Sequence, residues 1–385
     1  MDGPRRARRD EYTEAMAFID RVFRPGQRGR CILQSQYPHA YGPDRYRRLV
    51  LVREEGSIVG CLAVHPITYR VEGEQLQAGG IGAVGTESER RGRGIMTAML
   101  HHAVERMERE GCAISVLGGD RQRYGWFGWE RGGVRNCFSL LTRYVGKPST
   151  AERKLLLERF DGDPATCRRV RQLGLAHPYW VERTAADVVP LLKRRDRESW
   201  VCREGRRFAY VACSGVHRQP RPYERVDEAG GDPDLVMSMI RVLMARYHLP
   251  HLHGVCGPNP EETARYEPYS ADWHREHDGM VRIIDLERVV ASLAPVLRRR
   301  ARRAAVAGVF ELAVSGTEQR ARLTLGDQRP VHRVALTPAE MVRLLFGQLP
   351  VAEALAPRTG VSAAALDKLS LILPLPLHLP ALNHV

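Results

Sequence analysis

The sequence predicts an α/β fold of the α+β kind, built from mixed, mostly antiparallel sheets flanked by helices. Short β-rich segments with Glu-Gly turn signals alternate with amphipathic helical segments. The order hairpin, helix, strand occurs twice, in residues 49–119 and again in 199–257. The chain has 385 residues, which exceeds one ordinary hydrophobic core, so two or three domains are expected.

The first part of the chain combines a helix, an antiparallel meander, a second helix and a strand. Residues 10–23 place apolar side chains on one helical face, and residues 49–86 are typical of a meander. Residues 95–110 repeat apolar side chains at helical spacing. A short apolar strand follows at 112–119, and a loop rich in glycine and aromatic residues covers 119–133.

The second part begins after a polar segment at residues 148–163. A hairpin over residues 199–213 turns near Glu204-Gly205, and a helix over 235–249 precedes a strand at 252–257. This order repeats the outline of the first part, although the Arg-Gly stretch found there is absent. We interpret the second part as a degenerate copy.

A third part has a different character. It contains a helix over 286–300, an alternating strand pair, and a helix for which Thr337 and Glu340 predict a capping box. The tail, 369–385, has three prolines that forbid a helix, but its apolar content predicts that it packs into the protein. The expected domains are therefore residues 1–147, 148–285 and 286–385.

The basic charge does not by itself indicate a nucleic-acid partner. The formal charge is +14 and arginine supplies nearly all of it, spread along the chain. The arginine cluster at 298–303 lies at the end of a predicted helix, and helix C-termini favour cations. We therefore interpret it first as the solvated end of a helix. A surface that binds a polyanion is the alternative. No apolar run approaches the ~20 residues of a membrane helix, and no secretory signal is evident. Eight scattered cysteines favour reduced thiols and a cytoplasmic location.

The stretch ERRGRGIMTAML, residues 89–100, carries the clearest chemistry. A glycine turn at a helix N-terminus leaves backbone N–H groups converging, and the helix dipole adds positive character, so a phosphate fits there. The glycines allow close approach and the arginines neutralise charge. A plain β–α turn is the alternative. An RNA-binding Arg-Gly motif is less favoured, because such motifs normally repeat in disordered sequence.

Two motifs in order resemble the GNAT acetyltransferases. AVGTESERRGRGIMTAML is similar to the family's motif Arg/Gln-x-x-Gly-x-Gly/Ala, with Arg91 and Gly94 in register and Met96 replacing the last small residue. About thirty residues on, Tyr124-Gly125-Trp126-Phe127-Gly128-Trp129 resembles Tyr-x-x-x-Gly-Phe. Together with the degenerate copy and the third part, the whole chain resembles the Eis-type acetyltransferases, whose last domain is similar to sterol carrier proteins.

This resemblance implies a donor, a set of donor-binding residues and two catalytic groups. The implied donor is acetyl-CoA, with no metal. The implied donor-binding residues are Ala83, Val84, Gly85, Thr86, Arg91, Gly92, Arg93, Gly94, Ile95, Met96, Gly119 and Asp120. Tyr124 is implied as general acid, and the carboxylate of the C-terminal residue, Val385, as general base. Tyr37, Asp120 and Trp126 are candidates for contact with the acceptor, with core packing or turn capping as the alternatives.

These roles are chemically consistent. A carboxylate can take the proton of an alkylamine, whose pKa is ~10, and a tyrosine stays protonated at neutral pH and can protonate a leaving thiolate. The expected protein is a cytoplasmic N-acetyltransferase acting on a primary amine of a small molecule or peptide, such as an aminoglycoside, a polyamine or a lysine side chain. No nucleic-acid or membrane partner is expected, and a homo-oligomer is possible. Three rivals stay open: transfer of another acyl or aminoacyl group, a non-catalytic protein that binds coenzyme A or lipid, and an RNA binder.

Overall fold

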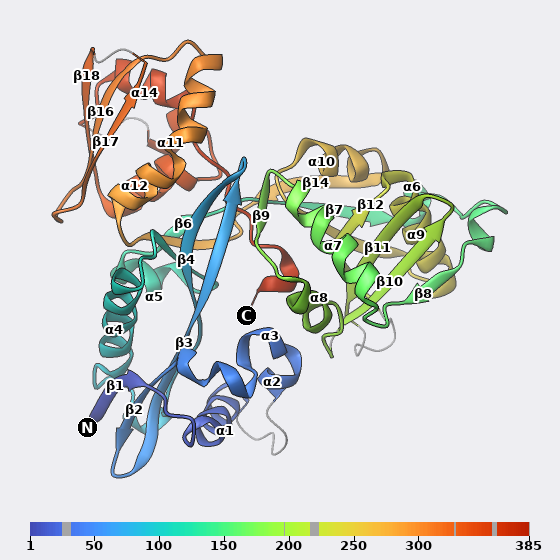
Figure 1. Cartoon of the computed structure of the whole chain (residues 1–385), viewed down its shortest axis with the longest axis horizontal. Helices are drawn as coiled ribbons and strands as arrows, with labels where there is room; N and C mark the ends of the chain where they lie inside the picture. The colour runs from blue at the N-terminus through green and yellow to red at the C-terminus, as the bar shows by residue number, and fades with distance from the viewer. Residues whose placement is uncertain (25–31, 196, 216–222, 327–328, 356–359, 385) are drawn as a thin grey trace.

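The computed structural model describes residues 1–24, 32–195, 197–215, 223–326, 329–355 and 360–384. Within these residues the strands form three sheets, each flanked by helices (Figure 1). The first sheet lies beneath the third part of the chain, and the second sheet lies to one side of both (Figure 1). The predicted α/β class with mixed, mostly antiparallel sheets is confirmed.

The first sheet has the strand order β1-β2-β3-β4-β5-β15-β6, with β9 paired to β3. Only β4 and β5 run parallel among its neighbours. Its strands are β1 (Asp2–Arg6), β2 (Leu49–Glu54), β3 (Ser57–Val71), β4 (Glu74–Thr86), β5 (Ile114–Leu117), β6 (Glu130–Gly132), β9 (Tyr179–Val181) and β15 (Gly279–Ile283). The β1 strand was not expected from the sequence.

Helices cover both faces of this sheet. The predicted helices are confirmed as α1 (Tyr12–Phe23) and α4 (Ile95–Arg109). Ile95, Met99 and Met107 of α4 are buried against one face, and Phe18 and Ile19 of α1 are buried against the other. Shorter helices complete the first part: α2 (Ile32–Gln36), α3 (Pro38–Tyr41) and α5 (Arg121–Tyr124).

The second sheet repeats this plan. Its order is β14-β7-β13-β12-β11-β10-β8, and only β12 and β13 run parallel. Its strands are β7 (Arg135–Leu141), β8 (Leu157–Arg159), β10 (Arg197–Glu204), β11 (Arg207–Ser214), β12 (Arg225–Gly231), β13 (His251–Cys256) and β14 (Ser270–Glu276). Its helices are α6 (Thr142–Val145), α7 (Pro164–Ala176), α8 (Ala185–Leu192), α9 (Pro233–Arg246) and α10 (Pro260–Tyr266). In both sheets a hairpin and a third strand are followed by a long helix and a parallel strand.

The two sheets exchange strands across the predicted domain boundaries. β7 precedes residue 148 in the chain but pairs with β13 and β14 of the second sheet. β15 lies before residue 286 but pairs with β5 and β6 of the first sheet. The boundaries at 147 and 285 therefore do not separate the sheets. This exchange brings the residue just before β15, Asp278, to the first domain.

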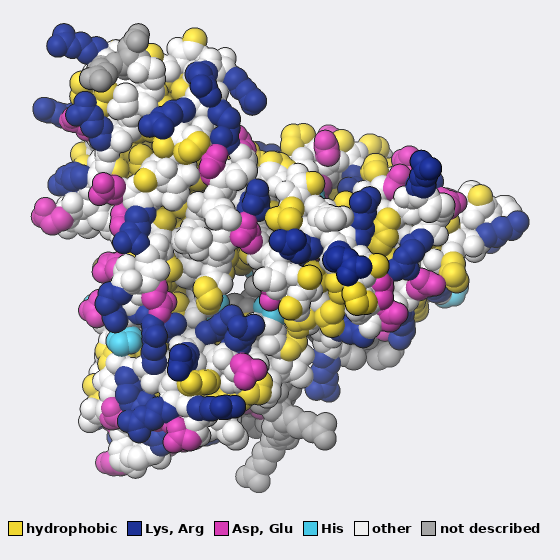
Figure 2. Space-filling model, viewed as in Figure 1, with side chains coloured by type: hydrophobic (Ala, Val, Ile, Leu, Met, Phe, Trp, Pro, Cys, Tyr) yellow, Lys and Arg dark blue, Asp and Glu magenta, His cyan; other side chains and the backbone are white. Residues whose placement is uncertain are grey.

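The third part is a three-stranded sheet covered by helices. Its strands are β16 (Gly308–Val314), β17 (Arg320–Leu325) and β18 (Val331–Leu336), and its helices are α11 (Leu286–Arg303), α12 (Pro338–Phe346), α13 (Val351–Leu355) and α14 (Ala363–Ser370). The capping box of Thr337 and Glu340 is confirmed at the start of α12. Figure 2 shows Lys and Arg side chains scattered among acidic ones over all three parts of this face.

The arginines at the end of α11 are not simply a solvated helix end. Arg299 lies 2.8 Å from the carboxylate of Glu74, and Arg300 contacts the carboxylate of Glu72 at 2.5 Å. Arg300 also donates to the carbonyl oxygens of Ile372 and Pro374. Two of the clustered arginines therefore connect the third part to the β3–β4 hairpin and to the tail.

The Pro-rich tail is packed as predicted. Apolar side chains of its first half, including Leu375 and Leu377, belong to the core shared by the first and third parts. Leu382 near its end belongs instead to a core of the second domain. The backbone N–H of Val134 donates to the carbonyl of Leu377 at 2.7 Å. The chain end thus lies between the first and second domains (Figure 1). Among the described residues, no helix is long and apolar enough to span a membrane.

Candidate active site

The Arg-Gly stretch forms an open turn at the start of α4. Gly92 and Gly94 have φ angles of +76° and +78°, and a Cβ at either position would meet nothing within 4 Å. Gly94 is the N-cap residue of α4, and no side chain caps this end. The first amides of a 15-residue helix therefore face open space with partial positive charge.

The two arginines of the turn differ in their contacts. Among the described residues the exposed Arg91 has no ion pair, whereas Arg93 lies 3.1 Å from Glu54. A diphosphate fits this turn.

The strand before this turn separates from its parallel neighbour. The pairing of β4 with β5 ends at Ile81 and Leu117, where β5 stops, while β4 continues to Thr86. At this point β4 also has a bulge opposite β3, and Ala83 adopts a φ of +49°, in the left-handed region. The bulge changes the direction of the strand, so that its edge is open beyond Ile81.

Tyr124 lies in this opening. Its side chain is buried, and its ring packs edge-on against Trp129, with 6.4 Å between ring centroids. A Cβ at Gly119 would lie 2.5 Å from the Tyr124 ring, so the ring rests directly on the backbone after β5. Burial raises the pKa of Tyr124, so the hydroxyl keeps its proton at neutral pH. None of the described residues hydrogen-bonds this hydroxyl.

A cavity of about 390 Å³ brings several predicted residues together. It is lined by Ala83, Val84, Gly119, Asp120 and Tyr124, and by Tyr37 from the segment before α3. Asp120 also caps α5, because its Oδ1 accepts the N–H of Gln122 at 2.9 Å. The turn-capping alternative for Asp120 is therefore confirmed, and a ligand contact stays a prediction.

Other predicted residues lie outside this cavity. Gly85 is buried against Val22 of α1, and Thr86 does not line the cavity. Trp126 does not line this cavity, and its contact with the acceptor stays a prediction. Its side chain is 90% exposed and borders a separate hollow with His101 and Phe127. The short helix α5 ends at Tyr124, so that Tyr124 points into the protein while Trp126 points to solvent.

The end of the tail approaches the same cavity. Arg194, buried in the second domain, donates to the carbonyl oxygens of Leu382 at 2.9 Å and His384 at 3.4 Å. The guanidinium of Arg194 lies 4.1 Å from the centroid of the Tyr37 ring, which lines the cavity. Arg183 donates to the side chain of Asn383. Val385 itself lies outside the described residues.

A buried acidic residue holds the tail from the other side. Asp278 Oδ2 lies 3.0 Å from Nδ1 of His378 and accepts the backbone N–H of Leu379. The histidine contact is an ion pair with poor hydrogen-bond alignment. Burial acts to raise the pKa of Asp278, but His378 and His384 lower it to about 2. Burial acts to lower the pKa of His378, but Asp278 raises it overall. Asp278 is therefore charged at neutral pH, and the positive form of His378 is favoured by the same contact.

Sequence reasoning missed these tail-binding residues. Asp278, Arg183 and Arg194 lie in no motif, and each reaches the tail through contacts more than a hundred residues apart. Only the tail itself gave a signal, since His378 and His384 are polar residues in an apolar segment. A polar residue in such a segment requires a buried partner.

One group of possible metal ligands lies away from this site. Cys137 on β7 and His274 and Glu276 on β14 have ligand atoms within 4.8 Å of one another. Glu276 is already paired with Arg135 at 2.7 Å, and burial raises the pKa of the Cys137 thiol to about 12. A cation would have to displace both the arginine and the thiol proton.

Gly119→Ala is expected to lower the activity of this site at least tenfold, because the added methyl group would displace the Tyr124 ring from its place. The melting temperature should change little, since Gly119 is exposed and the ring can move into the cavity. The control is Gly125→Ala, where a Cβ would meet nothing within 4 Å and φ is −60°. Equal activity of the two variants would contradict the proposed contact.

The domain that contains the separated strands β4 and β5 and the open turn before α4 resembles a known family. Residues 4–132 match the family described as acetyltransferase (GNAT) domain. This part of the chain is therefore similar to a GNAT acetyltransferase domain. An 82-residue stretch is 30% identical to an uncharacterized N-acetyltransferase, YhbS, of Escherichia coli strain K12. That stretch is 21% of this chain and 48% of the relative, so the chain spans about half the length of the curated relatives it matches.

Solved structures share the fold over the whole chain. A GCN5-related N-acetyltransferase from Anabaena variabilis superposes with a TM-score of 0.71 at 14% identity, covering 99% of both chains. One from Kribbella flavida gives 0.69 at 16% identity over 98% of both. Eis1 from Mycobacterium abscessus gives 0.62 at 13% identity over 97% of both. Solved structures therefore share this tandem GNAT-like architecture over nearly the whole chain.

Proposed function

We propose that this protein is an acetyl-CoA-dependent N-acetyltransferase that transfers acetyl to a primary amine. One observation carries the proposal. An open helix N-terminus, a splayed strand pair and a buried, protonated tyrosine follow one another on a single GNAT domain. The turn at Gly92 and Gly94 would hold the pyrophosphate of the donor. The open edge of β4 at Ala83 and Val84 would bind the pantetheine arm, which leads toward Tyr124.

The chemistry follows from these positions. The acceptor nitrogen attacks the thioester carbonyl, the N–C bond forms, and the C–S bond breaks. Tyr124 gives its proton to the leaving sulfur. Burial raises the pKa of Tyr124, so the phenol is protonated at neutral pH and a proton donor is available when the C–S bond breaks. The amine proton must go to a base. The Val385 carboxylate is the base predicted from the sequence, and the contacts of Leu382 and His384 support delivery of the chain end to this cavity.

The acceptor class stays broad. Asp20 and Asp120 line the cavity, but so do Arg24 and Arg123, so the wall carries balanced charge. Such a wall does not select a polycation by charge alone. An aminoglycoside, a polyamine and a lysine side chain are all compatible with a primary amine entering beside Tyr37. Transfer of a different acyl group is the nearest rival, and the mass added to the product distinguishes it.

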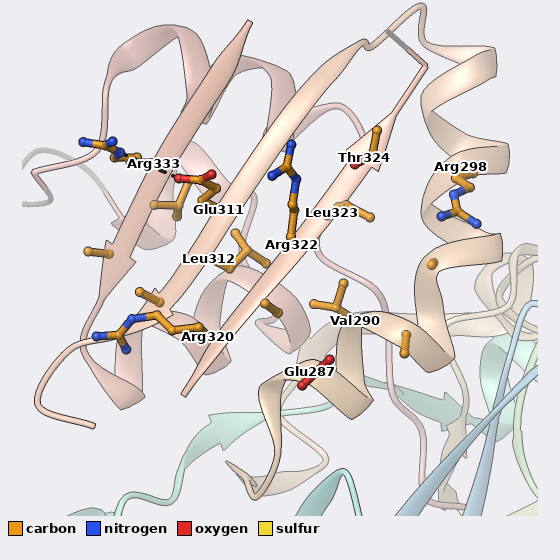
Figure 3. Close-up of a pocket in the computed structure, with 16 residues that line it drawn as sticks. Glu287, Val290, Arg298, Glu311, Leu312, Arg320, Arg322, Leu323, Thr324 and Arg333 are labelled. Atoms are coloured by element: carbon orange, nitrogen blue, oxygen red, sulfur yellow. Dashed lines mark ion pairs between the residues drawn. The ribbon is translucent and has the colours of Figure 1, made fainter. Parts of the chain in front are cut away.

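A second candidate function has one observation in its favour. A cavity of about 700 Å³ lies in the third part, far from Tyr124 in the chain, between α11 and the sheet (Figure 3). Its floor is apolar, including Val290 and Leu323. Its border carries four arginines and two glutamates, namely Arg298, Arg320, Arg322, Arg333, Glu287 and Glu311, of which Arg333 and Glu311 are paired at 3.7 Å. Such a cavity can take an anionic amphiphile, as expected of a sterol-carrier-like domain acting as the functional part. The resemblance to sterol carriers stays a prediction.

An acetylation assay tests the first proposal. The protein is incubated with acetyl-CoA and kanamycin, spermidine or Nα-acetyl-lysine amide, and free thiol and product mass are recorded. Thiol release that depends on an amine, with an added mass of one acetyl group, supports the proposal. Calorimetry with coenzyme A is run in parallel, because absence of binding would reject the donor site itself.

Gly94→Ala is expected to weaken coenzyme A binding at least tenfold. Alanine resists the left-handed backbone at φ +78°, so the first amides of α4 would turn from the phosphate position. Gly56→Ala is the matched control. Gly56 has φ +79°, also with open space around it, in the β2–β3 turn. The control should lose similar stability, about 1 kcal/mol, but bind coenzyme A normally. Equal binding of coenzyme A by both variants would contradict the role of the Gly94 turn in holding the pyrophosphate.

A further inference from the structure

The ring of His384 is fixed in one tautomer by its contacts. Its Nε2 lies 2.9 Å from the carbonyl oxygen of Leu379. A carbonyl oxygen only accepts hydrogen bonds, so Nε2 carries a hydrogen, and in the neutral ring Nδ1 is the nitrogen with the lone pair. None of the described groups contacts Nδ1 by a hydrogen bond. The imidazole thus presents a free proton acceptor.

A buried carboxylate oxygen faces the same ring. Asp278 Oδ1 lies 3.5 Å from Nε2 of His384 and has no hydrogen-bond partner among the described residues. The Asp278 side chain is only 4% exposed. Its other oxygen, Oδ2, already serves His378 and the N–H of Leu379. An unpartnered buried oxygen beside Nε2–H can stabilise a positive charge on this ring.

The position of His384 relates it to Tyr124. His384 and Asp278 line a small cavity of about 60 Å³. This cavity shares Ile81, Leu117 and Gly118 with the larger cavity that contains Tyr124. These shared residues mark the point where β4 and β5 separate. Under the proposed function, the thioester carbonyl would lie at this point.

We propose that His384 is the general base of the transfer, with Asp278 as its positioning residue. The proposal rests on the proposed acetyltransferase function. Nδ1 of His384 accepts the proton that the amine loses as its nitrogen bonds to the thioester carbon, and Asp278 Oδ1 stabilises the imidazolium. The sulfur leaves with the proton of Tyr124. Afterwards the imidazolium releases its proton to water and the Tyr124 phenolate takes one from water, so both groups return to their starting state.

Ordinary acidities favour an imidazole over a carboxylate for this step. An α-carboxyl group has a pKa of ~3.5 and an imidazole ~6.5, so the imidazole binds the amine proton about 1000-fold more strongly. A base is most effective when its pKa lies near the working pH. The titratable and charged neighbours of Asp278 are His378, His384 and, at 3.9 Å, Arg135. His378 in turn faces Glu262 and Glu228 as well as Asp278.

His384→Asn tests the proposal, with the exposed His274→Asn as control. His384→Asn should lower kcat about 10²- to 10³-fold and remove the acidic limb of the pH–rate profile. Coenzyme A binding and the melting temperature should stay within error, and imidazole added to His384→Ala should restore part of the activity. His274→Asn should match the wild type. A kcat within twofold of wild type, or an unchanged pH profile, in His384→Asn would overturn the proposal.

Two further measurements separate this proposal from its alternatives. Adding one glycine after Val385 moves the terminal carboxylate, and activity should largely persist if His384 is the base. If the extended chain is inactive and His384→Asn is fully active, the general base is the terminal carboxylate and not His384. ¹⁵N NMR of histidine-labelled protein, assigned with His384→Asn, should show the Nε2–H tautomer for His384. The Nδ1–H tautomer would overturn the proposal even if no acceptor amine is found, whereas missing coenzyme A binding would reject only the acetyltransferase function.

Discussion

Tyr124→Phe is expected to lower kcat about 10²- to 10³-fold, equivalent to about 3–4 kcal/mol of transition-state stabilisation. The variant keeps the ring that rests on Gly119 and packs against Trp129, and loses only the proton donor. Coenzyme A binding, measured by calorimetry, should therefore be unchanged. Because burial raises the pKa of Tyr124, the wild type should also keep its activity to alkaline pH.

The control for this variant is Tyr144→Phe. Tyr144 is half-exposed and lies on α6, in the second part of the fold, so its hydroxyl should be dispensable. Full activity of Tyr124→Phe would remove the tyrosine from the chemistry. A protein that only senses coenzyme A would give that result.

Asp278→Asn is expected to lower the free energy of unfolding by about 3 kcal/mol and to reduce activity severely. Removing one member of a buried ion pair leaves the other uncompensated, at a cost of ~3–5 kcal/mol. The cost should lie at the lower end, since the imidazole of His378 can release its proton. The tail should also become accessible to carboxypeptidase, because Asp278 binds it at His378 and Leu379. Chemical denaturation and timed digestion measure the two effects.

The pH dependence of this loss has a defined sign. The pKa of Asp278 is lowered from 3.8 to about 2, so its contribution is present above pH 3.8 and is lost as the pH falls toward 2. The pKa of His378 is raised from 6.5, so its contribution is present below pH 6.5 and is lost as the pH rises through the raised value. The difference between wild type and Asp278→Asn should thus be larger at pH 5.5 than at pH 9. Asp272→Asn, on the exposed face of β14, should show no such difference.

Local patterns in the sequence were sufficient for several of the longer elements. The helical spacing of apolar residues predicted α1 and α4, and the capping box predicted the start of α12. Each of these signals lies within a few residues, and the local backbone follows it. The order of the Arg-Gly turn and Tyr124 likewise predicted where a donor could bind. The sheets that β7 and β15 join could not be predicted, because both are short strands whose pattern does not identify their neighbours.

The sequence by itself determined the α/β class, the glycine turn before α4 and the position of Tyr124 a few residues after β5. Only the tertiary structure decided that Trp126 faces away, that Asp278 reaches the first domain through the exchanged β15, and that His384 faces Asp278. The reason is physical. Turns and helix ends are fixed by neighbouring residues, whereas a buried charge can only be stabilised by partners that the folded chain brings together from distant positions.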